Sequence, residues 1–116
     1  PSLISPETHA DFITEQFAGI AGTIPGPGRF DPCPWGLGVE LRGAKDPHWT
    51  GKQNAPSTSG HFGGAGTMMW IDPSIRTGLV ALTDHPFDEW SEQAISLWSE
   101  LSDATIEEIH AFEGAS

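Results

Sequence analysis

The chain has 116 residues, with 5 basic and 16 acidic side chains and a formal net charge of −11. Its length fits a single unit, residues 1–116, with room for one modest core. So negative a chain would be repelled by nucleic-acid phosphates and by anionic lipid head groups, which excludes both as expected partners.

Cysteine content and hydropathy bear on the compartment. Cys33 is the single cysteine, so the chain forms no internal disulfide and suits a reducing compartment. No apolar run approaches the ~18 residues of a membrane span, and no basic-then-apolar leader is present. We expect no membrane partner and no signal peptide, and a cytoplasmic location is slightly favoured.

A short helix is predicted near the N-terminus. Ser5 is a typical N-cap, Pro6 suits the first helical position, and Glu7 suits the positive end of the helix dipole. Three apolar residues then form a short stripe: Phe12, Ile13 and Phe17. Residues 18–34 contain too much Gly and Pro for a regular element, which predicts a structured loop.

Three strands are predicted next. Residues 35–42, WGLGVELR, alternate as a strand does, and residues 65–72 and 77–84 form two more strands joined by a turn. The last is apolar almost throughout, which is typical of a strand covered on both faces. The long polar loop 43–60 is expected to lie near a functional cleft, because such loops are seldom idle in compact domains.

The C-terminal residues predict two helices. Pro86 suits the start of the first, in which apolar residues recur at helical spacing as far as Leu101. Residues 102–112 predict a second, short helix capped by Ser102 or Asp103. The prediction is an α+β fold, in which a three-stranded antiparallel sheet is flanked by N- and C-terminal helices.

The glycine-rich stretch STSGHFGGAGTMMWIDP, residues 57–73, raises the question of a phosphate-binding loop. Such a loop needs a lysine after its last glycine and opens a helix. Here Thr67 follows Gly66, and a strand is predicted next. The dinucleotide-binding fingerprint also does not fit, because it requires glycines that follow a strand, whereas the glycines here precede one. We therefore expect no nucleotide cofactor.

Metal and triad chemistry are weakly indicated. None of the histidines lies at metal-binding spacing from another ligand, so we interpret them as scattered surface residues and expect no metal. They are His9, His48, His61, His85 and His110. Ser59, His61 and Asp72 could supply the residue types of a Ser-His-Asp catalytic triad, but the chain has no G-x-S-x-G motif to position the serine. Most aromatic residues suit a core, and Trp49 in the long loop is the clearest candidate to face a ligand.

The order of the segments carries a resemblance to a known family. WGLGVEL, a long polar loop, GHFGGAGTMMWIDP, TGLVALTD and an amphipathic helix resemble the C-terminal part of the serine β-lactamase-like family, over about residues 3–101. This family includes class C β-lactamases, D,D-peptidases, D-aminopeptidases and related esterases. The resemblance implies part of a β-lactamase/transpeptidase-like fold.

The resemblance also implies a site on the glycine-rich stretch. The family has a K-T-G motif on a strand at the edge of the active site, and many esterase and peptidase relatives have H-x-G instead, which His61-Phe62-Gly63 matches. It implies that His61, Phe62, Gly63 and Gly64 bind substrate, that His61 donates a hydrogen bond to a substrate carboxylate or carbonyl, and that the Gly64 N–H forms half of an oxyanion hole. A glycine here lets substrate lie against the backbone. A structural role for His61 at the start of a strand is the alternative.

The family's nucleophile and base are missing from this chain. No Ser is followed three residues later by Lys, and the chain has no Tyr. We therefore expect a C-terminal fragment of a serine hydrolase that cleaves an ester, amide or lactam through an acyl-serine, and a chain that is inactive alone. Its partners would be a small-molecule or peptide substrate and the N-terminal portion of the same hydrolase.

Two alternatives stay open. One is a non-catalytic binding or structural module of the same fold, which presents residues 43–60 and Trp49 to a ligand. The other is a homo-oligomer, in which two chains exchange strands to complete the sheet.

Overall fold

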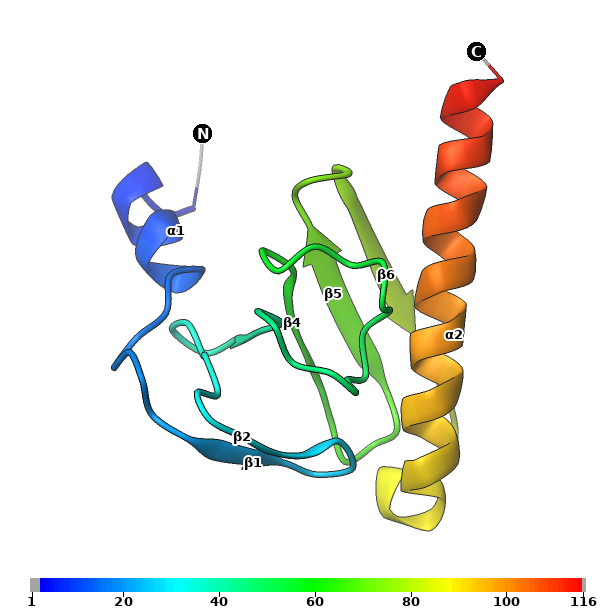
Figure 1. The fold of residues 1–116 in the computed structure, drawn as a ribbon, viewed down its shortest axis with the longest axis horizontal. Coiled ribbons are helices and arrows are strands. Elements are labelled where there is room, and N and C mark those ends of the chain that lie inside the picture. Colours follow the sequence, from blue (N-terminus) through cyan, green and yellow to red (C-terminus); the bar gives the residue numbers. More distant parts are fainter. Residues whose placement is uncertain (1–2, 116) are drawn as a thin grey trace.

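The computed structural model describes residues 3–115, which form one four-stranded sheet with a long helix along one face (Figure 1). The elements in chain order are α1 (Pro6–Phe12), β1 (Gly22–Ile24), β2 (Gly28–Phe30), β3 (Glu40–Leu41), β4 (Ser59–Phe62), β5 (Met68–Asp72), β6 (Thr77–Ala81) and α2 (Phe87–Gly114). The sheet is antiparallel with the order β3-β4-β5-β6, and β1 and β2 form a separate hairpin. The predicted α+β class is confirmed, with four strands in the sheet instead of three.

The prediction of a loop without regular elements at residues 18–34 is wrong, since β1 and β2 form there. The additional strand of the sheet is β4, Ser59–Phe62. Its sequence, SGHF, has neither β-branched residues nor clear alternation, so pattern alone did not separate it from the polar loop. Gly60 explains how it fits: a β-carbon there would lie 2.1 Å from the Met69 carbonyl oxygen on β5. The close approach of β4 and β5 therefore depends on Gly60, although glycine has a low propensity for strands.

Of the strand predicted at residues 35–42, only Glu40–Leu41 forms, as β3. The Gly36 N–H donates to the Val39 carbonyl at 2.8 Å, Trp35 and Glu40 form an isolated bridge, and Glu40–Leu41 pairs with β4. The cause is the pair of glycines: Gly38 has φ of +90°, which favours glycine. The alternating apolar residues before β3, which predicted a strand, lie instead in a tight turn.

The strands predicted at residues 65–72 and 77–84 are confirmed with shorter bounds as β5 and β6. The prediction that the second is covered on both faces is wrong, since Val80 is 61% exposed and Leu82 78% exposed. β6 is an edge strand, and α2 packs on one side of the sheet only. We call the other side, with the exposed side chains of Met69, Ile71, Val80 and Leu82, the outer face.

A single helix replaces the two predicted helices. α2 runs from Phe87 to Gly114, with a kink at Trp90, where φ is −149°. Ser102 lies in the helix interior and caps nothing: its hydroxyl donates to the Trp98 carbonyl at 2.6 Å and accepts from the Trp70 indole N–H at 2.8 Å. Bonding to the carbonyl four residues back satisfies a serine inside a helix, so no break is needed.

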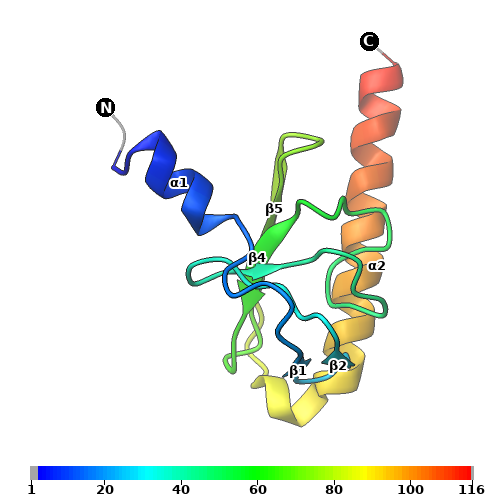
Figure 2. The same ribbon diagram turned by 60° about the vertical axis from the view of Figure 1, so that its left-hand side comes forward.

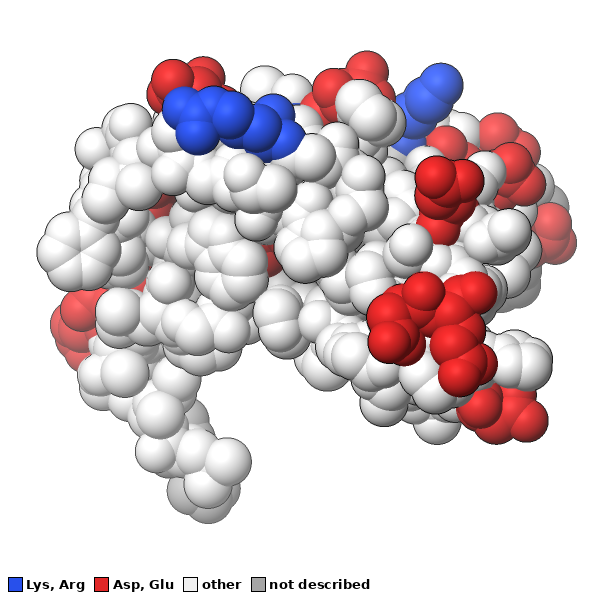
Figure 3. All heavy atoms as spheres, turned by 90° about the horizontal axis from the view of Figure 1, so that it is seen from below, with Lys and Arg blue, Asp and Glu red and all other residues white. Residues whose placement is uncertain are grey.

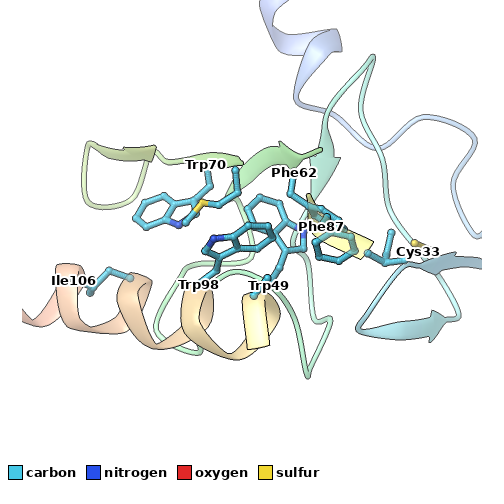
Figure 4. Packing of buried hydrophobic residues seen from close by; sticks show 10 residues of the cluster. Cys33, Trp49, Phe62, Trp70, Phe87, Trp98 and Ile106 are labelled. Carbon is cyan, nitrogen blue, oxygen red and sulfur yellow. The ribbon is translucent and has the colours of Figure 1, made fainter. Parts of the chain in front are cut away.

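The core lies between α2 and the inner face of the sheet (Figure 4). Phe87 and Trp98 stack with ring planes at 12°, and Phe62 lies 4.8 Å from Phe87 between ring centroids. Such aromatic pairs contribute about 0.5–1.5 kcal/mol each beyond their buried area. Trp49 also belongs to this cluster with 1% of its surface exposed, so the prediction that it faces a ligand is wrong.

Helix α1 begins as predicted and projects away from the sheet (Figure 2). The Ser5 hydroxyl accepts from the Thr8 N–H at 3.1 Å, and the helix buries none of its residues. It is held to the turn after Trp35, because the Phe12 carbonyl accepts from the Leu37 N–H at 3.0 Å. In the described residues, neither α1 nor α2 is long and apolar enough to cross a membrane.

Candidate functional site

The predicted site residues lie together at the end of β4. His61 and Phe62 are its last residues, and Gly63 and Gly64 begin the turn toward β5. His61 pairs with Met69 and is exposed, whereas Phe62 points into the core and is 9% exposed. One strand thus places the imidazole ring at the surface and anchors itself with the next side chain.

The backbone at this position faces an open strand edge. The pairing of β3 with β4 ends at Gly60, and the Gly63 N–H donates to the Thr67 carbonyl at 2.9 Å on the β5 side. Because successive residues of an antiparallel strand direct their backbone groups to opposite sides, Phe62 directs its backbone groups to the edge beyond β3. Gly64 lies in the turn after the strand, and its carbonyl accepts from the Phe87 N–H at 2.9 Å. No described strand pairs with β4 there.

Both glycines face empty space. A β-carbon built on Gly63 or Gly64 would have no neighbouring atom within 4 Å. Nothing in the packing of the described chain therefore requires a glycine at either position. The space in front of them is open to another molecule or another segment.

A cleft of about 340 Å³ lies beside this edge. Trp35, His61 and Phe87 line it together with the β1 hairpin, and Gly63 and Gly64 form part of its wall. The Trp35 indole packs edge-on against the His61 imidazole, with 5.6 Å between ring centroids and 68° between ring planes. The ring of His61 is thus oriented by an aromatic neighbour at the cleft.

A buried charge network lies at the base of the cleft, centred on Glu40. Glu40 is 2% exposed and also lines the cleft. Its carboxylate accepts from the Lys45 ammonium at 2.7 Å, from the Trp49 indole N–H at 2.8 Å, and from the His48 imidazole. Buried charges are tolerated when they are paired and hydrogen-bonded in this way.

Hydrogen bonds fix the protonation states in this network. Burial alone would raise the pKa of Glu40, but the bonds from His48, Lys45 and Trp49 outweigh it and lower that pKa. Burial lowers the pKa of His48 despite its bond to Glu40. The Thr50 N–H donates to His48 Nδ1 at 3.2 Å, so this nitrogen carries no proton and the neutral ring donates to Glu40 through Nε2.

The structure does not assemble a triad from Ser59, His61 and Asp72. Asp72 is 1% exposed on the inner face of the sheet, whereas His61 is on the outer face. Its carboxylate accepts from the Ala55 N–H at 2.9 Å and from the Ser74 hydroxyl at 2.6 Å. Although burial raises the pKa of Asp72, these bonds lower it overall, so the side chain is a structural acceptor.

The histidines fall into two environments. His9, His61, His85 and His110 are exposed, but the interpretation of His48 as a surface residue is wrong, because it is 4% exposed and bonded to Glu40. Within residues 3–115, no three His, Cys, Asp or Glu side chains gather as metal ligands would.

The loop 43–60 is ordered and packed against α2. The Gln53 N–H donates to the Asp103 carboxylate at 2.8 Å, and the Gly51 N–H donates to the Asn54 side chain at 2.8 Å. A second cavity, of about 430 Å³, lies between this loop and α2. The loop meets the cleft through the contact of His48 with Glu40.

Comparison with known proteins gives one informative match. No family model matches the chain, and no curated protein matches it. The crystal structure of a β-lactamase from Mycobacterium bovis is similar, with a TM-score of 0.86 and 46% sequence identity. The match covers 94% of this chain and 39% of that chain, so this chain spans about two-fifths of the length of that β-lactamase. The chain therefore has a β-lactamase-like fold and is similar to one part of such a protein.

Proposed function

We propose that this chain forms one wall of the active site of a larger serine hydrolase, which cleaves an ester, amide or lactam through an acyl-serine intermediate. The observation that carries the proposal is the open edge of β4, where His61 and two unobstructed glycines border a cleft of about 340 Å³. The similarity to part of a β-lactamase supports it.

In this proposal the chain contributes hydrogen-bond donors. When a serine from outside these 116 residues attacks the substrate carbonyl, negative charge develops on the carbonyl oxygen. The N–H of Gly64 donates to that oxygen, and one donor of this kind stabilises a transition state by about 2.7–4 kcal/mol. His61 donates to the bound substrate from the adjacent position.

The outer face is the proposed contact with the rest of the hydrolase. Met69, Ile71, Val80 and Leu82 place an apolar surface on the side of the sheet away from α2, with between 48% and 78% of each residue exposed. Exposed apolar surface of this kind marks an interaction site. The N-terminal portion of the hydrolase is the proposed occupant, and a second copy of the chain is the competing one.

A covalent serine probe tests the proposal. A fluorophosphonate should label the longer protein that contains this chain, and mass spectrometry should place the labelled serine outside residues 1–116. The isolated chain, as the matched control, should stay unlabelled. A labelled serine within the chain, or no labelling of the longer protein, would contradict the proposed function.

Light scattering tests the occupant of the outer face. The isolated chain should associate weakly, and addition of the N-terminal portion should give a 1:1 complex. A stable dimer that the N-terminal portion does not dissociate would favour the second copy instead.

A further inference from the structure

The cleft beside β4 has a mostly apolar lining. Ile24 and Pro25 from the hairpin, Trp35 from the turn, Phe62 from β4 and Phe87 from α2 all border it. Glu40 and His61 are the titratable side chains that line it. A lining of this composition favours an apolar ligand group, oriented by a few polar groups.

The cation nearest to the cleft is fully occupied. The Lys45 ammonium donates to Glu40 at 2.7 Å, to the Leu41 carbonyl at 2.8 Å and to the Pro34 carbonyl at 3.0 Å. A lysine has three donors, so all of its hydrogen-bonding capacity is used within the chain. Lys45 is also 3% exposed and cannot reach a ligand without breaking the network.

The remaining cations of the chain do not line the cleft either. In the β1–β2 hairpin Arg29 lies opposite Thr23, which lines the cleft. The guanidinium of Arg29, however, lies 3.8 Å from the Asp31 carboxylate. Arg42 and Lys52 border the other cavity, beside α2. Arg76 lies in the turn between β5 and β6, at the end of the sheet opposite to Phe62.

The surface charge points the same way. Figure 3 shows a largely uncharged face, with the largest group of acidic side chains on the α2 side, further acidic side chains at the opposite edge and upper rim, and basic ones at the upper rim. The net charge is −11, and the Lys45 ammonium is already paired with Glu40, so a ligand carboxylate would find no free Lys or Arg among the residues of this chain that line the cleft. An unpaired charge in a desolvated site is strongly disfavoured.

We infer that the part of the cleft formed by this chain accepts an uncharged apolar group and disfavours a carboxylate; in the proposed hydrolase that group would be the apolar acyl or alkyl group of a neutral ester or amide. Of the two groups that His61 was expected to meet, it then donates to the carbonyl. This inference rests on the proposed function for the substrate's role, but the ligand preference of the cleft belongs to the chain itself.

Ligand binding to the isolated chain tests the preference directly. Methyl phenylacetate and phenylacetate are a matched pair, because they differ in the charge of the carboxyl group. In a titration followed by ¹H–¹⁵N NMR, methyl phenylacetate should shift the amide signals of Gly63 and Gly64 and the indole signal of Trp35. Phenylacetate should bind at least tenfold more weakly, which is about 1.4 kcal/mol.

Two glycine variants show whether the binding is at this cleft. Gly64→Val fills open space beside it and should abolish the shifts, whereas Gly114→Val fills open space at the end of α2 and should keep them. Arg29→Ala should leave the ratio of the two affinities unchanged. Equal or tighter binding of phenylacetate, binding that survives Gly64→Val, or a ratio that depends on Arg29 would overturn the inference.

The two proposals fail separately. If the longer protein is not labelled by a serine probe, the proposed function fails, yet the preference for the uncharged probe is still measured on the isolated chain. If the longer protein is labelled but phenylacetate binds as well as its methyl ester, the function stands and the inferred substrate class fails.

Discussion

The indole ring of Trp35 packs edge-on against the imidazole ring of His61, with 5.6 Å between ring centroids and a 68° angle between ring planes. Trp35 is itself fixed, because its carbonyl accepts from the Gln16 N–H at 2.8 Å and it bridges to Glu40. The orientation of His61 therefore depends on contacts made far from it in the sequence.

Replacement of Trp35 should release the ring of His61. An aromatic pair contributes about 0.5–1.5 kcal/mol, so in the longer hydrolase Trp35→Leu should lower kcat by roughly two- to twelvefold. Trp35→Phe, which keeps an aromatic edge, should restore most of the activity. A decrease in kcat without sharpening or displacement of the His61 ring signals in NMR would show that Trp35 does not act through His61.

Removal of the His61 side chain should impair catalysis directly. His61→Ala in the longer hydrolase should lower kcat/KM by more than tenfold, which corresponds to about 1.4 kcal/mol or more. His85→Ala is the matched control, since His85 is also exposed but does not line the cleft. Steady-state kinetics on both variants check this, and unchanged kinetics for His61→Ala would leave it a structural role.

Two glycine-to-alanine substitutions four residues apart should differ in their effect on stability. Gly64→Ala should leave the free energy of unfolding within about 0.5 kcal/mol, because a β-carbon there has no neighbour within 4 Å. Gly60→Ala should lower it by at least about 2 kcal/mol, because its β-carbon would lie 2.1 Å from the Met69 carbonyl oxygen. Urea unfolding of the isolated chain measures both, and equal stabilities would refute the proposed packing of β4 on β5.

Replacement of Lys45 should lower the free energy of unfolding more than replacement of the exposed Lys52. Lys45→Met leaves the buried carboxylate of Glu40 without its cation, and breaking a buried pair in this way costs about 3–5 kcal/mol. Lys52→Met is the control, because Lys52 is exposed and its side chain pairs with no described carboxylate. Chemical denaturation of the two variants compares them; similar midpoints would mean that the Glu40 network contributes little.

Stability should fall as the pH is lowered below neutrality. His48 has a pKa below its ordinary 6.5 in the folded chain, so the unfolded chain binds the extra proton first and stability decreases as the pH falls below that value. The pKa of Glu40 is likewise below its ordinary 4.5, which adds a further loss at still lower pH. Thermal unfolding between pH 7 and pH 4 measures the trend. His48→Gln should flatten the part between pH 7 and pH 5, and a profile unaffected by this substitution would exclude His48 as the titrating group.

The elements with strong local signals could be predicted from the sequence. The cap at Ser5, the strand around Trp70 and the start of α2 after Pro86 all follow from local preferences. β4 was missed, because its glycine is dictated by the neighbouring strand and not by its own propensity. The break expected at Ser102 does not occur, because its hydroxyl donates to the Trp98 carbonyl within the helix and accepts from the Trp70 indole N–H on the sheet.

The candidate site was predicted by resemblance and its surroundings were not. The stretch from His61 to Gly64 matched a family motif, so its place at a strand edge was expected. The network of Glu40, Lys45 and His48 was missed, because its members come from a strand and from a loop whose polar residues indicated solvent. An isolated glutamate in an apolar strand sequence, VEL, was the available signal that a buried cation must lie nearby.

The two methionines of β5 show how the chain would assemble with a partner. Met68 is 3% exposed and its neighbour Met69 is 48% exposed, yet both are large and apolar. The core on the α2 side is already closed without any other chain, so folding of this unit and docking of its outer face are separate events. In the hydrolase proposed above both surfaces belong to one longer chain, so docking is intramolecular; for the two portions produced separately it would be bimolecular, with a rate and extent that depend on both concentrations.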